Sequence, residues 1–165
     1  MQDLIAEAGP LRLERSPVDL RKIVESILNL FEKEIKNKEI AVMKYYEEQI
    51  PPLNLDGQRI HQALLNLILN AIQSMERCGI LSVEIACTAD RVSLAISDSG
   101  VGMSPGELEE IFDTYYTTKK EGSGIGLSVT LRIVEAHDGA IEVESEPGKG
   151  TRVCVFLPKN PGMGR

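Results

Sequence analysis

The segment Gln62-Ala-Leu-Leu-Asn66-Leu-Ile-Leu-Asn70-Ala-Ile-Gln73 carries the most informative pattern in this chain of 165 residues. At about 100° per residue its apolar side chains form one broad helical face. Its amide side chains gather in a narrow stripe on the opposite side: Gln62, Asn66, Asn70 and Gln73. Asn disfavours a helix interior because it competes for backbone hydrogen bonds, and a solvated face usually carries Lys and Glu instead. Two interpretations stay open: a solvated face, or a cleft wall whose amide oxygens ligate a hard cation such as Mg²⁺.

Regular elements are predicted on both sides of this segment. Apolar residues at helical spacing follow Asp19, and the helix with the amide stripe begins at the N-cap Asp56 and runs to about Arg77. A short helical turn at 107–112 and a helix at 125–137 follow. Alternating apolar side chains predict strands at residues 39–46, 79–88, 91–97, 140–145 and 151–157. This order favours an α+β fold, a two-layer sandwich in which about three helices cover one mixed, mostly antiparallel sheet of about five strands.

Glycines mark both ends of a long loop in the second half of the chain. Asp98 ends a strand and is followed by Ser-Gly-Val-Gly102. The carboxylate can accept a hydrogen bond from a ligand amine, and the glycines let a ligand come close to the backbone. A simple turn is the alternative. The run Gly122-Ser-Gly-Ile-Gly126-Leu127 opens a helix whose N–H groups could bind an anion. Between the two, the hydroxyl and ammonium groups of residues 115–120 suit either phosphate contact or a solvated surface. Loops of this length are usually either lids or disordered segments.

Composition and motifs exclude several other classes of function. The net charge of −7 argues against a nucleic-acid binder, which needs a basic patch. The glycine runs match neither the dinucleotide-binding fingerprint nor the P-loop. The three cysteines show no ligand spacing, so we expect no zinc site, no disulfide framework and a cytoplasmic location. No stretch is apolar enough to insert directly into a membrane, which leaves open that a longer parent protein is membrane-attached.

In their order and spacing these motifs resemble the catalytic, ATP-binding domain of bacterial two-component sensor histidine kinases, and among them the nitrogen-regulation sensors. The wider family shares its ATP-binding fold with type II topoisomerases, mismatch-repair ATPases and a heat-shock chaperone. The resemblance covers about residues 18–158 and rests on the N box (65–71), the first glycine box (98–102), the F box (111–119), the second glycine box (122–127) and a closing strand signal (148–151). It implies ATP and Mg²⁺ as cofactors, and a long ATP lid.

The resemblance also implies roles for individual residues. Asn70 would ligate Mg²⁺, and Asn66, one helical turn earlier, would position the phosphates with Lys119; Asn66 and Lys119 are the expected catalytic residues. Asp98 would accept the exocyclic amine of adenine, with support from Thr151 through water. The implied nucleotide-binding set is Asn66, Asn70, Asp98, Gly100, Gly102, Met103, Thr118, Lys119, Gly122, Ser123, Gly124, Ile125, Gly126, Leu127 and Thr151. Asn66 stands where hydrolytic relatives carry a water-activating Glu, and an amide is no base, which favours phosphoryl transfer over hydrolysis.

The phosphate acceptor is expected outside this chain. Histidine kinases of this type phosphorylate a His followed by an acid and a Pro, on a separate dimerising helical hairpin, and neither His61 nor His137 has that context. We expect both histidines to be structural. Residues 1–17 are then an irregular lead-in from a missing helical dimerisation domain, residues 18–158 are the ATP-binding domain, and residues 159–165 are a tail. The expected partners are ATP, the His-containing hairpin and, through it, a response regulator.

One departure from the family pattern and two alternatives bear on this interpretation. Gln73 and Ser74 stand where many kinases carry Lys and an aromatic residue, which removes one possible phosphate contact. A Ser-directed kinase of the anti-sigma type would share the fold and need no helical hairpin. A nucleotide-gated binding module would close on ATP without chemistry. Transfer of labelled phosphate to a supplied hairpin separates a histidine kinase from both.

Overall fold

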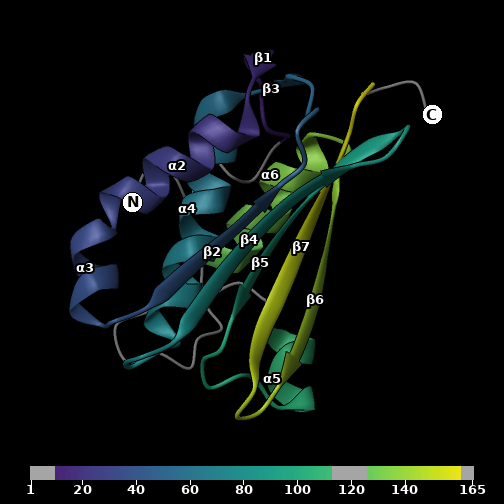
Figure 1. Ribbon diagram of the computed structural model, residues 1–165. Coiled ribbons are helices and arrows are strands. Elements are labelled where there is room, and N and C mark those ends of the chain that lie inside the picture. Colours follow the sequence, from purple (N-terminus) through teal and green to yellow (C-terminus); the bar gives the residue numbers. More distant parts are fainter. Residues whose placement is uncertain (1–9, 113–125, 161–165) are drawn as a thin grey trace.

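The computed structural model describes residues 10–112 and 126–160. They form two layers, a sheet and a set of helices packed against one of its faces (Figure 1). The sheet consists of β2 (Ala41–Tyr46), β4 (Ile80–Cys87), β5 (Arg91–Asp98), β7 (Gly150–Pro158) and β6 (Ala140–Glu146), in that spatial order. β2 runs parallel to β4, and the other neighbouring pairs are antiparallel. The predicted α+β sandwich with a mixed, mostly antiparallel sheet is confirmed.

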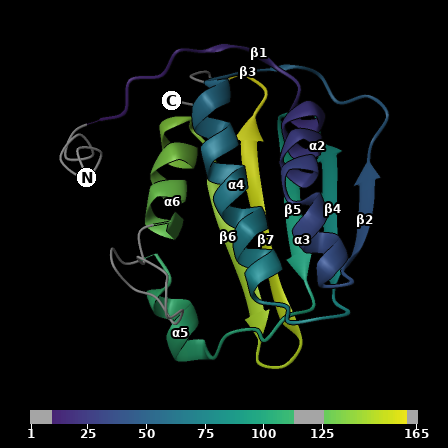
Figure 2. The ribbon, with the colours of Figure 1, turned by 90° about the vertical axis from the view of Figure 1, so that its left-hand side faces the viewer.

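The helices lie side by side on one face of the sheet (Figure 2). α2 (Leu20–Leu30) and α3 (Glu32–Asn37) follow one another, α4 (Gly57–Gln73) lies at the centre, and α6 (Gly126–Ala136) lies on the other side of α4. The short α5 (Pro105–Glu110) lies apart from them, near the β6–β7 hairpin. Among residues 10–112 and 126–160, no helix combines the length and the apolar character needed to cross a membrane.

The core lies between the helices and the sheet. Alternate residues of β4 and β5 face the helices and are buried: Leu81, Val83, Ile85, Val92, Leu94 and Ile96. α4 contributes its apolar face, whose buried members include Ile60, Leu64, Leu67, Ile68 and Ala71. Burying an aliphatic side chain of this size stabilises the fold by roughly 1.5–3 kcal/mol. Because its apolar face is held against the core, the amide stripe of α4 must point away from the sheet.

Capping side chains fix where the helices begin. Asp19 caps α2, and Asp56 caps α4 by accepting the backbone N–H of Arg59 at 3.2 Å. Both caps are those that the sequence predicts. Ser104 and Glu107 form a capping box at the start of α5, so the helical turn expected at 107–112 begins earlier. A cap of this kind typically contributes about 1 kcal/mol.

Three details differ from the predicted elements. The expected irregular lead-in is wrong at its end, where Ser16–Val18 form β1 and pair with β3 (Leu53–Leu55) in an antiparallel ribbon; three residues are too few for alternation to reveal a strand. A separate helix, α3, follows a break at Phe31. α4 ends at Gln73, short of the expected Arg77, and Lys38 Nζ donates to the carbonyls of Ile72 and Met75 at that end, each at 3.0 Å.

Candidate functional site

The amide stripe of α4 is sheltered in its middle and exposed at its ends. Asn66 and Asn70 are half-buried, whereas Gln62 and Gln73 are exposed. Residues four positions apart on a helix project in the same direction, so the two asparagines form a pair beside the core. Their amide oxygens are suitable ligands for a hard cation such as Mg²⁺. The metal-ligating role of Asn70 and the phosphate-positioning role of Asn66 stay predictions.

Asp98 is the last residue of β5 and lies directly opposite Thr151 on β7. Side chains directly opposite in an antiparallel pair share a face, with Cβ atoms roughly 4.5–5.5 Å apart. This face is the one that the helices cover, because Asp98 alternates with the buried Leu94 and Ile96. The Oδ1 atom of Asp98 accepts the N–H of Gly100 at 2.9 Å, which holds the carboxylate in place. The structure thus brings together the two residues that were predicted to bind adenine.

Gly100 and Gly102 are packed against the protein's own backbone. A Cβ at Gly100 would lie 2.2 Å from the Oγ of Ser74 and 2.5 Å from its carbonyl oxygen, just beyond α4. Gly102 has a φ of +69°, and a Cβ there would lie 2.0 Å from the carbonyl oxygen of Glu146. Val101, between them, donates its N–H to the Ser74 carbonyl at 3.1 Å. The family resemblance implies that these glycines let the base come close to the backbone. The structure adds that the loop has no room for a side chain at either position.

A hydroxyl group that sequence reasoning missed lies next to Thr151. Ser145 is the cross-strand partner of Thr151 on β6, and their side-chain oxygens are 2.8 Å apart. The Oγ of Ser145 also accepts the N–H of Met103 at 2.8 Å and donates to the carbonyl of Gly150 at 3.0 Å. It therefore joins the loop after the first glycine box to the start of β7. Its place opposite a predicted site residue in a hairpin is the one signal that could have revealed it.

A hollow of about 310 Å³ opens at this end of the sheet. Its lining includes Asp98, Ser145 and Thr151, and also Ser97, Glu144 and Arg152, whose register places them on the face of the sheet away from the helices. A second hollow, of about 330 Å³, lies at the start of α4 beside Asp56. Of the amide stripe, Gln62 lines the second hollow, and the Asp56 carboxylate there is committed to capping α4. We place the candidate site at the strand ends of β5 and β7 because Asp98 and Thr151 lie directly opposite each other there.

Part of the predicted site lies outside the described residues: Thr118, Lys119, Gly122, Ser123, Gly124 and Ile125. Gly126 and Leu127, which follow them, are the first residues of α6. The second glycine box therefore leads directly into a helix, as predicted. α6 is antiparallel to α4, so its first turn lies alongside the half of α4 that carries the two asparagines (Figure 2).

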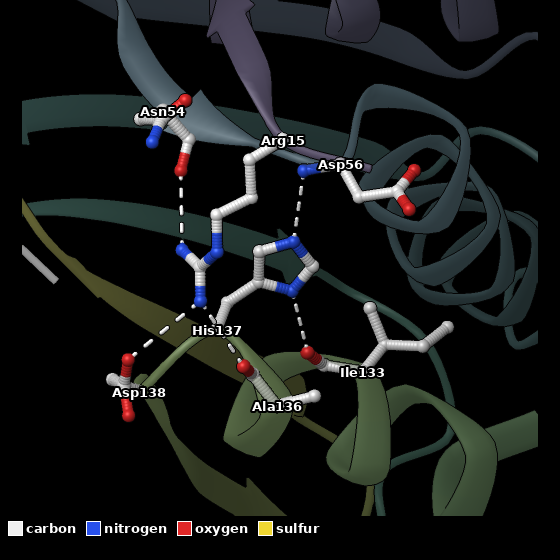
Figure 3. A network of polar contacts seen from close by, with 7 residues as sticks. All are labelled: Arg15, Asn54, Asp56, Ile133, Ala136, His137 and Asp138. Atoms are coloured by element: carbon white, nitrogen blue, oxygen red, sulfur yellow. Dashed lines mark hydrogen bonds and ion pairs between the residues drawn. The ribbon is translucent and has the colours of Figure 1, made fainter. Parts of the chain in front are cut away.

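A buried histidine fixes the opposite ends of α4 and α6 (Figure 3). His137, just after α6, is fully buried; its Nδ1 donates to the carbonyl of Ile133 at 2.7 Å, and its Nε2 accepts the N–H of Asp56 at 3.0 Å. Burial lowers the pKa of His137 below its ordinary value, so the imidazole is neutral. Both ring nitrogens are engaged within the protein, in agreement with the expected structural role. His61 is half-exposed on α4.

Arg15 ties the N-terminal segment to the same place (Figure 3). Its guanidinium donates to the carbonyls of Asn54 at 3.2 Å and Ala136 at 3.3 Å, and it forms an ion pair with Asp138 at 3.7 Å. Burial alone would raise the pKa of Asp56, but two backbone N–H donors bring it below the ordinary value. This network joins the chain before β1 to the start of α4 and the end of α6.

Comparisons with known proteins agree with this geometry. Residues 55–161 match the family described as "Histidine kinase-, DNA gyrase B-, and HSP90-like ATPase". Sensor histidine kinase ZraS of Escherichia coli (strain K12) is 36% identical over 160 residues, which cover 97% of this chain and 34% of ZraS. Sporulation kinase C of Bacillus subtilis (strain 168) is 31% identical over 159 residues, which cover 96% of this chain and 37% of that protein. The chain thus spans about a third of the length of these curated relatives.

Solved structures share the fold. The nucleotide-free catalytic domain of histidine kinase ThkA aligns with a TM-score of 0.81 at 28% identity, over 89% of this chain and 97% of that one. Full-length ShkA in complex with AMPPNP aligns with a TM-score of 0.83 at 26% identity, over 94% of this chain and 33% of that one. Together with the ordered motifs and the pairing of Asp98 with Thr151, these matches show that the chain belongs to the histidine kinase-, DNA gyrase B- and HSP90-like ATPase family.

Proposed function

We propose that this chain is the ATP-binding catalytic domain of a sensor histidine kinase and transfers the γ-phosphoryl group of ATP to a histidine on a separate dimerisation domain. The observation that carries the proposal is the pairing of Asp98 with Thr151, on the face of the sheet that the helices cover. The relatives support it, because ZraS is named a sensor histidine kinase and sporulation kinase C a kinase. These names favour this function over a Ser-directed kinase or a module that binds nucleotide without chemistry.

The nucleotide would lie between the ends of β5 and β7 and the helices α4 and α6. Asp98 would accept the exocyclic amine of adenine, and the N–H groups of residues 122–127 would hold the phosphates with Lys119. ShkA was solved with AMPPNP, and the ligand proposed here is of the same kind. Two half-buried amides one helical turn apart fit a hard cation. Mg²⁺ held by Asn70 would neutralise charge on the phosphates.

This chain would supply positioning rather than the attacking group. Asn66 is an amide and cannot act as a base toward water. His137 cannot be the acceptor, because it is fully buried and both of its ring nitrogens are hydrogen-bonded. The acceptor would lie on a helical hairpin of the parent protein, and the phosphoryl group would pass from it to a response regulator. We propose residues 18–158 as the catalytic domain, acting in the cytoplasm.

Transfer of labelled phosphate tests the proposal. The chain is incubated with γ-labelled ATP, Mg²⁺ and a dimerising helical hairpin from a sensor histidine kinase. We expect acid-labile label on the hairpin, appearing slowly because the two parts are not tethered, and none on the chain alone. Asp98→Asn should reduce the label, and the control His61→Gln should not.

Each alternative has its own signature in the same assay. Acid-stable label would indicate a Ser-directed kinase, and saturable ATP binding without any transfer would indicate a binding module. Label on the isolated chain that disappears in His61→Gln or His137→Gln would contradict the proposal, because the acceptor would then be internal.

A further inference from the structure

Asp98, Thr151 and Ser145 form one row across three neighbouring strands. Thr151 is the register partner of Asp98 on one side and of Ser145 on the other. The three side chains therefore share the face of the sheet that the helices cover. Ser145 and Thr151 are both half-buried, and their hydroxyl groups hydrogen-bond to each other.

The hydrogen-bonding capacity of Ser145 is fully used. A hydroxyl group has one proton to donate and two lone pairs to accept with. The N–H of Met103 can only donate, so it takes one lone pair, and the carbonyl of Gly150 can only accept, so it takes the proton. The one capacity left for the contact with Thr151 is the second lone pair. Thr151 must therefore donate its own proton to Ser145.

We propose that Ser145 is a positioning residue for base selection, which fixes Thr151 as a hydrogen-bond acceptor toward the bound nucleotide. This inference rests on the nucleotide site proposed above. Thr151 is expected to support the base through water, and with its proton committed to Ser145 it can only accept from that water, as can the neighbouring carboxylate of Asp98. A water that donates both protons to these two acceptors offers only lone pairs to the base, which suits an exocyclic amine and disfavours a carbonyl oxygen. Ser145 thus strengthens the preference for a 6-aminopurine over a 6-oxopurine without touching the base.

The test compares ADP with inosine diphosphate, which carries a carbonyl at position 6 and no exocyclic amine. Dissociation constants for both are measured for the wild-type chain, Ser145→Ala, Thr151→Val and the double variant. In Ser145→Ala the Thr151 hydroxyl is released and can donate to the bound water, which can then donate to a carbonyl oxygen. We expect the preference for ADP to fall by about five- to tenfold, the factor that one ordinary hydrogen bond is worth.

The double variant separates positioning from a general structural effect. If Ser145 acts through Thr151, then Ser145→Ala should leave the ADP preference unchanged once Thr151 is Val. The matched control Ser93→Ala, a half-buried serine of β5, should leave the preference at its wild-type value.

The outcomes distinguish this inference from the proposed function. A wild-type chain that binds neither nucleotide would contradict both. A wild-type chain that prefers ADP, with the same preference in Ser145→Ala, would overturn this inference alone. Equal weakening of both nucleotides in Ser145→Ala would also overturn it, because Ser145 would then only hold the loop at Met103.

Discussion

Replacing Gly150 by Ala should damage both stability and nucleotide binding, whereas replacing Gly148 by Ala should damage stability alone. Both glycines lie at the β6–β7 turn with positive φ, +115° for Gly150 and +79° for Gly148. A non-glycine residue in such a conformation costs roughly 1–3 kcal/mol. The two positions differ in their surroundings. A Cβ at Gly148 meets nothing within 4 Å, but at Gly150 it would lie 1.9 Å from the carbonyl oxygen of Asp98.

The magnitude follows from that contact. Real Cβ atoms essentially never approach another heavy atom more closely than 3.0 Å, so Ala at position 150 must displace the backbone at Asp98 by about 1 Å. Overpacking of this kind costs a further 1–3 kcal/mol or so. We therefore expect losses in the free energy of unfolding of about 1–3 kcal/mol for Gly148→Ala and about 2–6 kcal/mol for Gly150→Ala. A displacement of this size at a binding group should also weaken ADP binding by about tenfold or more.

Urea unfolding and calorimetric titration with ADP measure the two effects separately. Gly106→Ala is the unstrained control, because a Cβ at Gly106 meets nothing within 4 Å and its φ is not positive. Equal ADP affinity in Gly150→Ala and Gly148→Ala would contradict this prediction, because the backbone contact would then leave the position of the Asp98 carboxylate unchanged.

Three further predictions concern single side chains. Asp98→Asn should weaken ADP binding by about 1.5–3 kcal/mol, the value of a charge-assisted hydrogen bond, and the exposed control Asp90→Asn should not; unchanged affinity in a folded Asp98→Asn protein removes this carboxylate from the site. A chelator of Mg²⁺ should weaken ATP binding to the wild type but not to Asn70→Ala; equal sensitivity of both proteins excludes Asn70 as the ligand. The unfolded chain takes up a proton on His137 near pH 6.5 and the folded chain only at lower pH, so the free energy of unfolding should decrease as pH falls below about 6.5. His137→Gln should flatten that decrease and His61→Gln should not, and an unchanged pH slope in His137→Gln shows that another group causes it.

The fold could be predicted where periodicity extends over many residues. In α4, β4 and β5 the buried residues are apolar and recur at the period of the helix or strand, so their spacing in the sequence reveals these elements directly. β1 could not be predicted, because a strand of three residues that contains Pro17 has no period to detect. Its partner β3 is equally short. The break at Phe31 could not be predicted either, because apolar residues at helical spacing continue from α2 up to that residue.

The candidate site was predictable in its motifs and not in its supporting contacts. Asp98 could be selected only through the order of motifs that the chain shares with the family, because an acidic residue at a strand end before two glycines also fits a simple turn. Ser145 could not, because alternation places it after Ile141 and Val143 on the inward side of β6 but does not reveal that it lies opposite Thr151. The sequence predicts a ligand-binding role for Gly100 but not its packing against the protein's own backbone. The close contact of Gly100 with Ser74 depends on where α4 ends, and Lys38, from another part of the chain, hydrogen-bonds to the backbone there.

A crystal structure of this chain with Mg²⁺ and a non-hydrolysable ATP analogue is the decisive measurement, because it shows directly which residues hold the nucleotide. We expect the adenine amine to contact the Asp98 carboxylate beside Thr151, and the phosphates to lie next to Asn66 and Asn70. A nucleotide bound in the hollow beside Asp56, or bound with no contact to Asp98, would contradict it.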